Sequence, residues 1–173
     1  MLEHLLASPA ARTLVQYLIT PETRLAVIVP GIASLAILIF YARQGKISRR
    51  LQLLWVLTLG VSFCCARWEV TEEVQQLYIY SAFSVACLLL LFKRIYIAPA
   101  LAFALTFLAL WWVDVICALF RALQSGADLD RFYVGVGGAG AGDGLLLVPL
   151  LTGLAVAYAA GRIRARGEQL AEF

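Results

Sequence analysis

Long runs of apolar residues, separated by short polar segments, are the main feature of this sequence. Five such blocks occur, at about 25–42, 51–68, 74–92, 95–120 and 144–161. A helix needs roughly 20 apolar residues to cross about 30 Å of hydrocarbon, and about 17 to 25 are tolerated. Within each block the apolar residues are nearly continuous and do not recur at amphipathic spacing, as expected for helices surrounded by lipid. The pattern predicts an all-α bundle of about five transmembrane helices.

The composition supports the same class of protein. Of 173 residues, 62% are hydrophobic and only 14% are charged, whereas a soluble domain carries roughly 25% charged residues. We therefore expect residues 1–173 to form a single integral membrane domain, multi-pass in the cell inner (cytoplasmic) membrane, with the lipid bilayer as its main environment. Nucleic-acid binding is not needed to explain the basic residues.

The positions of the basic residues predict an orientation. Nine of the fourteen lie in three segments that alternate along the chain, at 43–50, 93–94 and 162–166. Cytoplasmic loops carry an excess of Lys and Arg, so these segments are expected inside and residues 162–173 are expected to form a cytoplasmic tail. The N-terminus is then outside, where residues 1–24 are expected to form an amphipathic lead-in on the membrane surface.

Asp114 lies well inside the fourth apolar block. A carboxylate in hydrocarbon is costly unless it meets a partner or a water-filled cavity. Arg67 is the basic residue within a neighbouring block, near its outer end. We therefore predict an intramembrane ion pair between Asp114 and Arg67 that holds two helices together.

A glycine-rich segment precedes the fifth block. Its spacing of small residues, at Gly138, Gly140, Gly142 and Gly144, lets helix backbones approach closely in a membrane. The segment is interpreted either as a packing surface, between subunits or with another membrane protein, or as a flexible lead into the last helix.

The tetrapeptide Gly140–Asp143 resembles the GxGD motif of intramembrane aspartyl proteases, the presenilin and prepilin-peptidase group. The resemblance implies a catalytic pair in which Asp143 works with a second aspartate, here Asp114, as acid and base. It covers four residues. Prepilin peptidases have a lysine where this chain has Leu145, and residues 41–50 lack the aspartate and the proline of their cytoplasmic segment.

A metal or cofactor site has little support in the sequence. His4 is the single histidine, and the four cysteines lack metal-ligand spacing. The adjacent Cys64 and Cys65 could relay a soft metal ion, but neighbouring helical residues point about 100° apart. No cofactor is predicted. The favoured function is a non-catalytic subunit or accessory factor that binds itself or another membrane protein, of the assembly, exclusion, immunity or small-channel type. The alternatives are the GxGD protease and a small ion or soft-metal transporter.

Overall fold

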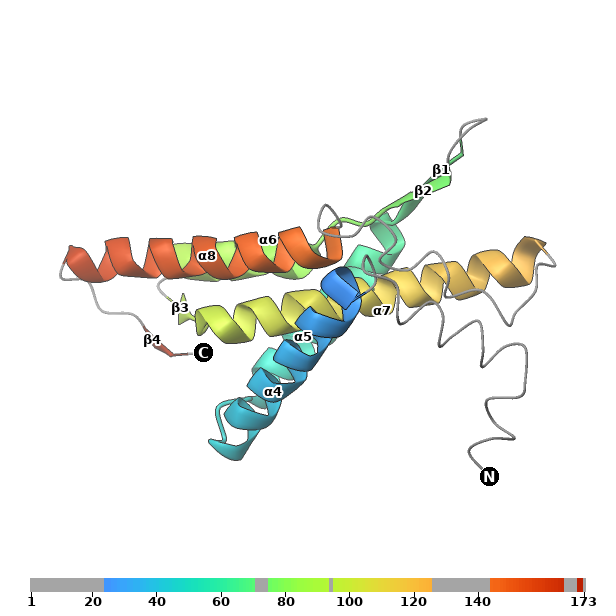
Figure 1. Ribbon diagram of the computed structural model, residues 1–173. Helices are drawn as coiled ribbons and strands as arrows, with labels where there is room; N and C mark the ends of the chain where they lie inside the picture. The colour runs from blue at the N-terminus through green and yellow to red at the C-terminus, as the bar shows by residue number, and fades with distance from the viewer. Residues whose placement is uncertain (1–23, 71–74, 94, 126–143, 167–170, 173) are drawn as a thin grey trace, which may run out of the picture.

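The computed structural model describes residues 24–70, 75–93, 95–125, 144–166 and 171–172, so the lead-in at 1–24 lies outside them except for its last residue. Within these ranges the chain is all-α, as predicted (Figure 1). A short π-helix, η1 (Arg24–Ile28), leads into the helices α4 (Val29–Arg43), α5 (Arg49–Cys65), α6 (Ala82–Phe92), α7 (Pro99–Ser125) and α8 (Gly144–Ala165).

Three segments of these helices are long and apolar enough to cross a membrane. They are Ala26–Arg43, Pro99–Arg121 and Gly144–Ala165. The chain is therefore a multi-pass membrane protein by length and composition of its helices. The second and third predicted blocks also contain helices, but α5 has 17 residues and opens with two arginines, and α6 has 11 residues.

A β-hairpin replaces the predicted helical ends at 67–68 and 75–78. Its strands β1 (Arg67–Val70) and β2 (Gln75–Tyr78) pair antiparallel, with Arg67 opposite Tyr78. The segment is rich in glutamate and glutamine, which are costly in hydrocarbon, and its β-branched and aromatic residues favour strands. Helix α6 then begins at Ala82, because the Ser81 hydroxyl accepts a hydrogen bond from the Ser84 amide at 3.3 Å.

The last two helices also differ from the predicted boundaries. The block at 95–120 begins with a short strand, β3 (Ile95–Tyr96), which pairs parallel with β4 (Ala171–Glu172), and α7 starts only at Pro99. Proline is favoured in the first helical turn because its missing amide has no helical partner there. Helix α8 continues to Ala165, so the predicted tail at 162–173 is helical in its first residues.

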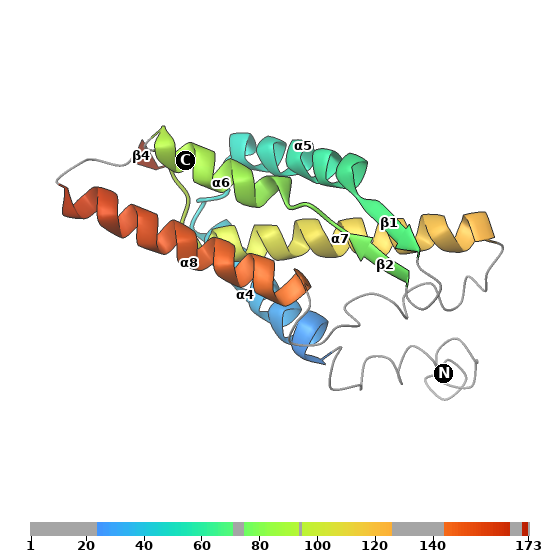
Figure 2. The same cartoon turned by 90° about the horizontal axis from the view of Figure 1, so that it is seen from above.

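Helix α7 is the centre of the bundle and contacts each of the other four α-helices (Figure 2). One buried cluster joins Phe83 of α6, Leu101 of α7 and Val156 of α8. A second cluster surrounds Phe107 and the start of α8. Helices α4 and α5 both run obliquely to α7 in Figure 1, and Figure 2 shows them on opposite sides of it, while α6 and α8 lie alongside α7.

The three basic segments meet at one end of the bundle. Helices α4, α6 and α8 end there, and α5 and α7 begin there. The Arg164 guanidinium of α8 lies 4.8 Å from the centroid of the Tyr96 ring of β3. Residues of the α4–α5 loop and of the segment before α7 line a common cavity. The chain therefore passes back and forth between this basic end and the end that carries the hairpin.

Candidate functional site

Asp114 lies half-buried on α7, and Arg67 is exposed at the start of β1. The end of α5, just before β1, packs against α7: the rings of Phe63 and Phe120 have their centroids 5.9 Å apart. The end of α5 therefore lies against the second half of α7, which carries Asp114, while the hairpin projects away from α7 (Figure 1). The ion pair between Asp114 and Arg67 stays a prediction.

The glycine-rich segment is described only at its last member. Gly138, Gly140, Gly142 and the candidate catalytic Asp143 lie outside the described residues. Gly144 is the first residue of α8, is exposed, and an added Cβ would meet no atom within 4 Å. Gly144 therefore makes no close helix contact with the described residues.

A glycine that the sequence analysis did not single out forms a close helix contact. A Cβ built on Gly153 of α8 would lie 3.2 Å from the Pro99 carbonyl oxygen and 3.4 Å from the Phe103 Cβ of α7. A signal in the sequence is Ala160, seven residues after Gly153, since both are small residues buried on α8 and small residues let membrane helices approach closely. Gly153 lies in the middle of an apolar block, where the hydrophobic pattern does not distinguish a packing position from a lipid-facing one.

Hydroxyl groups connect three of the helices. The hydroxyl oxygens of Thr152 and Ser84 are hydrogen-bonded at 2.8 Å, and those of Ser84 and Ser81 at 2.7 Å. The Ser62 hydroxyl of α5 accepts a hydrogen bond from the Ala82 amide at 3.0 Å. Hydrogen bonds between membrane helices each contribute on the order of 1 kcal/mol. The bonds from Ser62 and Thr152 therefore hold α6 between α5 and α8.

Two further hydroxyls, on Ser34 of α4 and Thr106 of α7, are fully buried and have no hydrogen-bond partner among the described residues. Both lie on helices that pack against each other.

Cys64 and Cys65 are exposed at the end of α5. The described part of the chain contains no group of three His, Cys, Asp or Glu residues able to hold a metal ion. The structure therefore brings no additional described ligand to this pair, and the soft-metal alternative gains no support.

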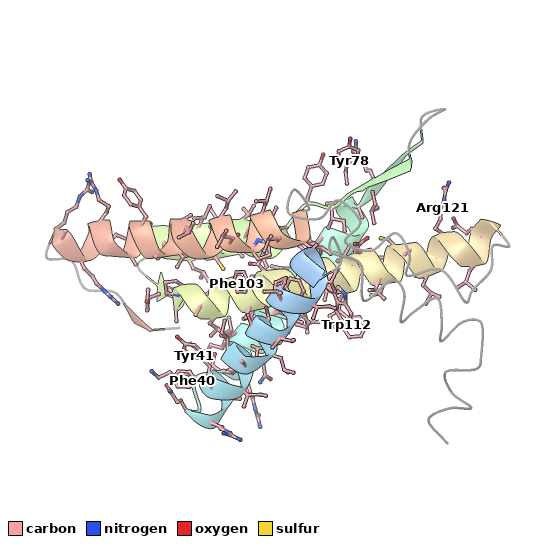
Figure 3. The ribbon with its side chains drawn as sticks, viewed as in Figure 1. Phe40, Tyr41, Tyr78, Phe103, Trp112 and Arg121 are labelled. Atoms are coloured by element: carbon pink, nitrogen blue, oxygen red, sulfur yellow. The ribbon has the colours of Figure 1, made fainter. Side chains whose placement is uncertain are left out.

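The last turns of α7 extend beyond the ends of the neighbouring helices (Figures 1 and 2). They carry large apolar side chains that the described chain leaves exposed: Leu119, Phe120 and Leu123 are 37%, 53% and 57% exposed. Figure 3 shows Arg121 on the same projecting part of α7, well past Trp112. An apolar surface next to a charged residue at the end of a long helix is a candidate contact surface for another protein.

Comparison with models of known protein families, with curated proteins and with solved structures gives no match.

Proposed function

We propose that this chain is a non-catalytic subunit or accessory factor of the inner membrane that acts by binding a second copy of itself or another membrane protein. The observation that supports the proposal is the projecting end of α7. This class of function includes assembly, exclusion, immunity and small-channel proteins.

Helix α7 is longer than the hydrocarbon layer is thick. Its 27 residues span about 40 Å at about 1.5 Å per residue, whereas the hydrocarbon layer is about 30 Å thick. If Pro99 lies at one boundary of this layer, the helix reaches the other near Leu119. Exposed leucine and phenylalanine at and beyond that level lie where lipid tails no longer cover them fully. A partner that packs on this surface would remove it from water.

The test is the mass of the complex in a mild detergent. Changing Leu119 and Leu123 together to serine should shift the particle to the mass of a single chain, because the apolar contact is lost while the five helices keep their own packing. Leu35→Ser is the matched control, because Leu35 is a similarly exposed leucine on α4, away from the projecting end. The proposal fails if the wild-type chain is already single and carries no other protein. It also fails if both variants dissociate equally.

The orientation and the five crossings belong to the same proposal. The alternation of the chain between the two ends of the bundle supports five crossings. The basic end would face the cytoplasm, since short cytoplasmic loops are enriched in Lys and Arg. Helix α6, with 11 residues, covers only about 16 Å at about 1.5 Å per residue, so it is the shortest of the five proposed crossings.

Cysteine labelling or reporter fusions test this topology. Lys46 and Arg49 should be accessible only from the cytoplasmic side, and Glu72 and Asp130 only from the outside. A cytoplasmic Asp130 would reverse the orientation and restore the comparison with prepilin peptidases, whose aspartates lie at the cytoplasmic end.

A further inference from the structure

A cavity of about 380 Å³ lies at the basic end of the bundle, between the α4–α5 loop and the start of α7. Its polar lining comes from Tyr41, Lys46, Ser48 and Tyr96, and part of its apolar lining from Leu51 and Leu101. Tyr41 lies near the end of α4, towards the loop (Figure 3). Because these residues flank the ends of two candidate membrane spans, the cavity lies at the level of a membrane surface.

The loop that carries Lys46 is tightly built. Gly45 has a φ of 65°, the left-handed conformation that glycine adopts without strain. The amides of Gly45 and Lys46 donate hydrogen bonds to the carbonyls of Ala42 and Tyr41, each at 3.0 Å, and so satisfy the end of α4. Ser48 then caps α5 by accepting a hydrogen bond from the Leu51 amide at 3.2 Å. Lys46 is therefore held in a defined turn at the edge of the cavity.

The electrostatics of the cavity favour an anion. Lys46 is the cation among its described lining residues, and none of them is acidic. Helix α5 starts just after Ser48 and α7 just after Ala98, so two helix N-termini with positive dipole ends adjoin the cavity. The surrounding basic end adds Lys93 and Arg164, against one described acidic residue, Glu172, whose backbone pairs with that of Tyr96. The C-terminus of α4, which carries the opposite dipole, already has its carbonyls paired within the turn.

We propose that this cavity binds a phosphate group at the membrane surface. The ammonium group of Lys46 supplies the charge, and the hydroxyl groups of Tyr41, Ser48 and Tyr96 are available hydrogen-bond donors. Leu51 and Leu101 close the inner side of the cavity and are already buried in the core, at 1% and 3% exposure. The two sources of the group are an anionic phospholipid headgroup and a soluble phosphate ester, and the position of the cavity next to the ends of two candidate membrane spans favours the lipid. The site is independent of the contact surface on α7.

The experiment measures phospholipid retained by the full-length protein in a mild detergent, by native mass spectrometry. The probes are phosphatidylglycerol, phosphatidylcholine and, as a soluble competitor, glycerol 3-phosphate. Lys46→Gln should weaken phosphatidylglycerol retention by about fivefold or more, since one basic residue near an anionic headgroup is worth roughly a factor of five. Ala98→Leu should also weaken retention without changing any charge, because Ala98 lines the cavity and a leucine side chain would occupy part of it.

Lys93→Gln is the matched control. Lys93 is exposed at the same end of the bundle but is not part of the cavity lining, so its loss should change retention much less. Preference for phosphatidylglycerol over phosphatidylcholine that glycerol 3-phosphate does not compete supports the lipid source. Competition by glycerol 3-phosphate supports the soluble source. If Lys46→Gln and Lys93→Gln lose retention of phosphatidylglycerol equally and Ala98→Leu loses none, the lipid is attracted by the overall positive charge of this end. That result would overturn the proposed site. Absence of binding to either anionic probe would overturn it as well.

Discussion

Replacing Gly153 by leucine should force α7 and α8 apart. It should lower the free energy of unfolding more than a substitution at an exposed position of either helix. The new Cβ alone would lie 3.2 Å from the Pro99 carbonyl oxygen, and a backbone atom cannot rotate away as a flexible side chain can. Overpacking of this kind costs about 1 to 3 kcal/mol and occasionally more. Lost packing between membrane helices also has no hydrophobic replacement, because lipid is as apolar as the helix surface. We expect a loss near the top of this range.

Gly161→Leu is the matched control on the same helix, since a Cβ at Gly161 would meet no atom within 4 Å. Both changes replace a helical glycine by the same residue, so their difference isolates the contact with α7. Denaturation in detergent, followed by tryptophan fluorescence, measures the free energy of unfolding of each variant. Equal stabilities of the two variants would contradict the close contact between α7 and α8.

Asp114→Leu and Arg67→Leu should each destabilise the protein, and the double change should recover much of the loss. A charge left without its partner in a low-dielectric environment costs about 3 to 5 kcal/mol when fully buried. Asp114 is half-buried, so Arg67→Leu should cost about 1 to 2 kcal/mol, whereas Arg67 is exposed in the single chain, so Asp114→Leu should cost about 1 kcal/mol or less. The double variant carries neither charge, and its coupling energy is the measure of the ion pair.

The outcome for Asp114 also separates structure from catalysis. Additive losses in the double variant would show that Arg67 is not the partner. Asp114→Asn and Asp143→Asn proteins that assemble normally but lose a proteolytic activity would instead favour the aspartyl dyad, because one carboxylate cannot serve as both acid and base. A fully functional Asp143→Asn protein would exclude the protease alternative.

The helical class could be read from sequence because lipid leaves few choices to the backbone. An apolar run of 20 residues has no water to satisfy its amides and carbonyls, so it must form a helix or a closed barrel. The three candidate spans fall on the first, fourth and fifth predicted blocks. The three basic segments, found by counting charges along the chain, are indeed brought to one end of the bundle.

The sequence pattern does not predict the hairpin, because Arg67, Trp68 and residues 75–78 fall at the ends of the second and third apolar blocks. The strands β1 and β2 form because they pair with each other. A run of apolar residues indicates only whether a segment lies in lipid or in water, and not which segment it pairs with. The continuous apolar pattern also hid which side of each helix packs inward. Trp55 illustrates this: its indole N–H donates a hydrogen bond to the Leu105 carbonyl of α7 at 2.8 Å, a role that its position in the sequence does not reveal.

Only the tertiary structure decided which small and polar residues matter. Gly153 becomes a contact point because α7 lies across it, and the glycine-rich run before α8 shows no such contact at its described member. The phosphate cavity combines the turn around Lys46 with Tyr96, which lies 50 residues further along the chain. Sequence patterns report the environment of each segment by itself, because burial in lipid acts on every residue separately. A site forms where two segments meet, and that is determined by the packing of the whole bundle.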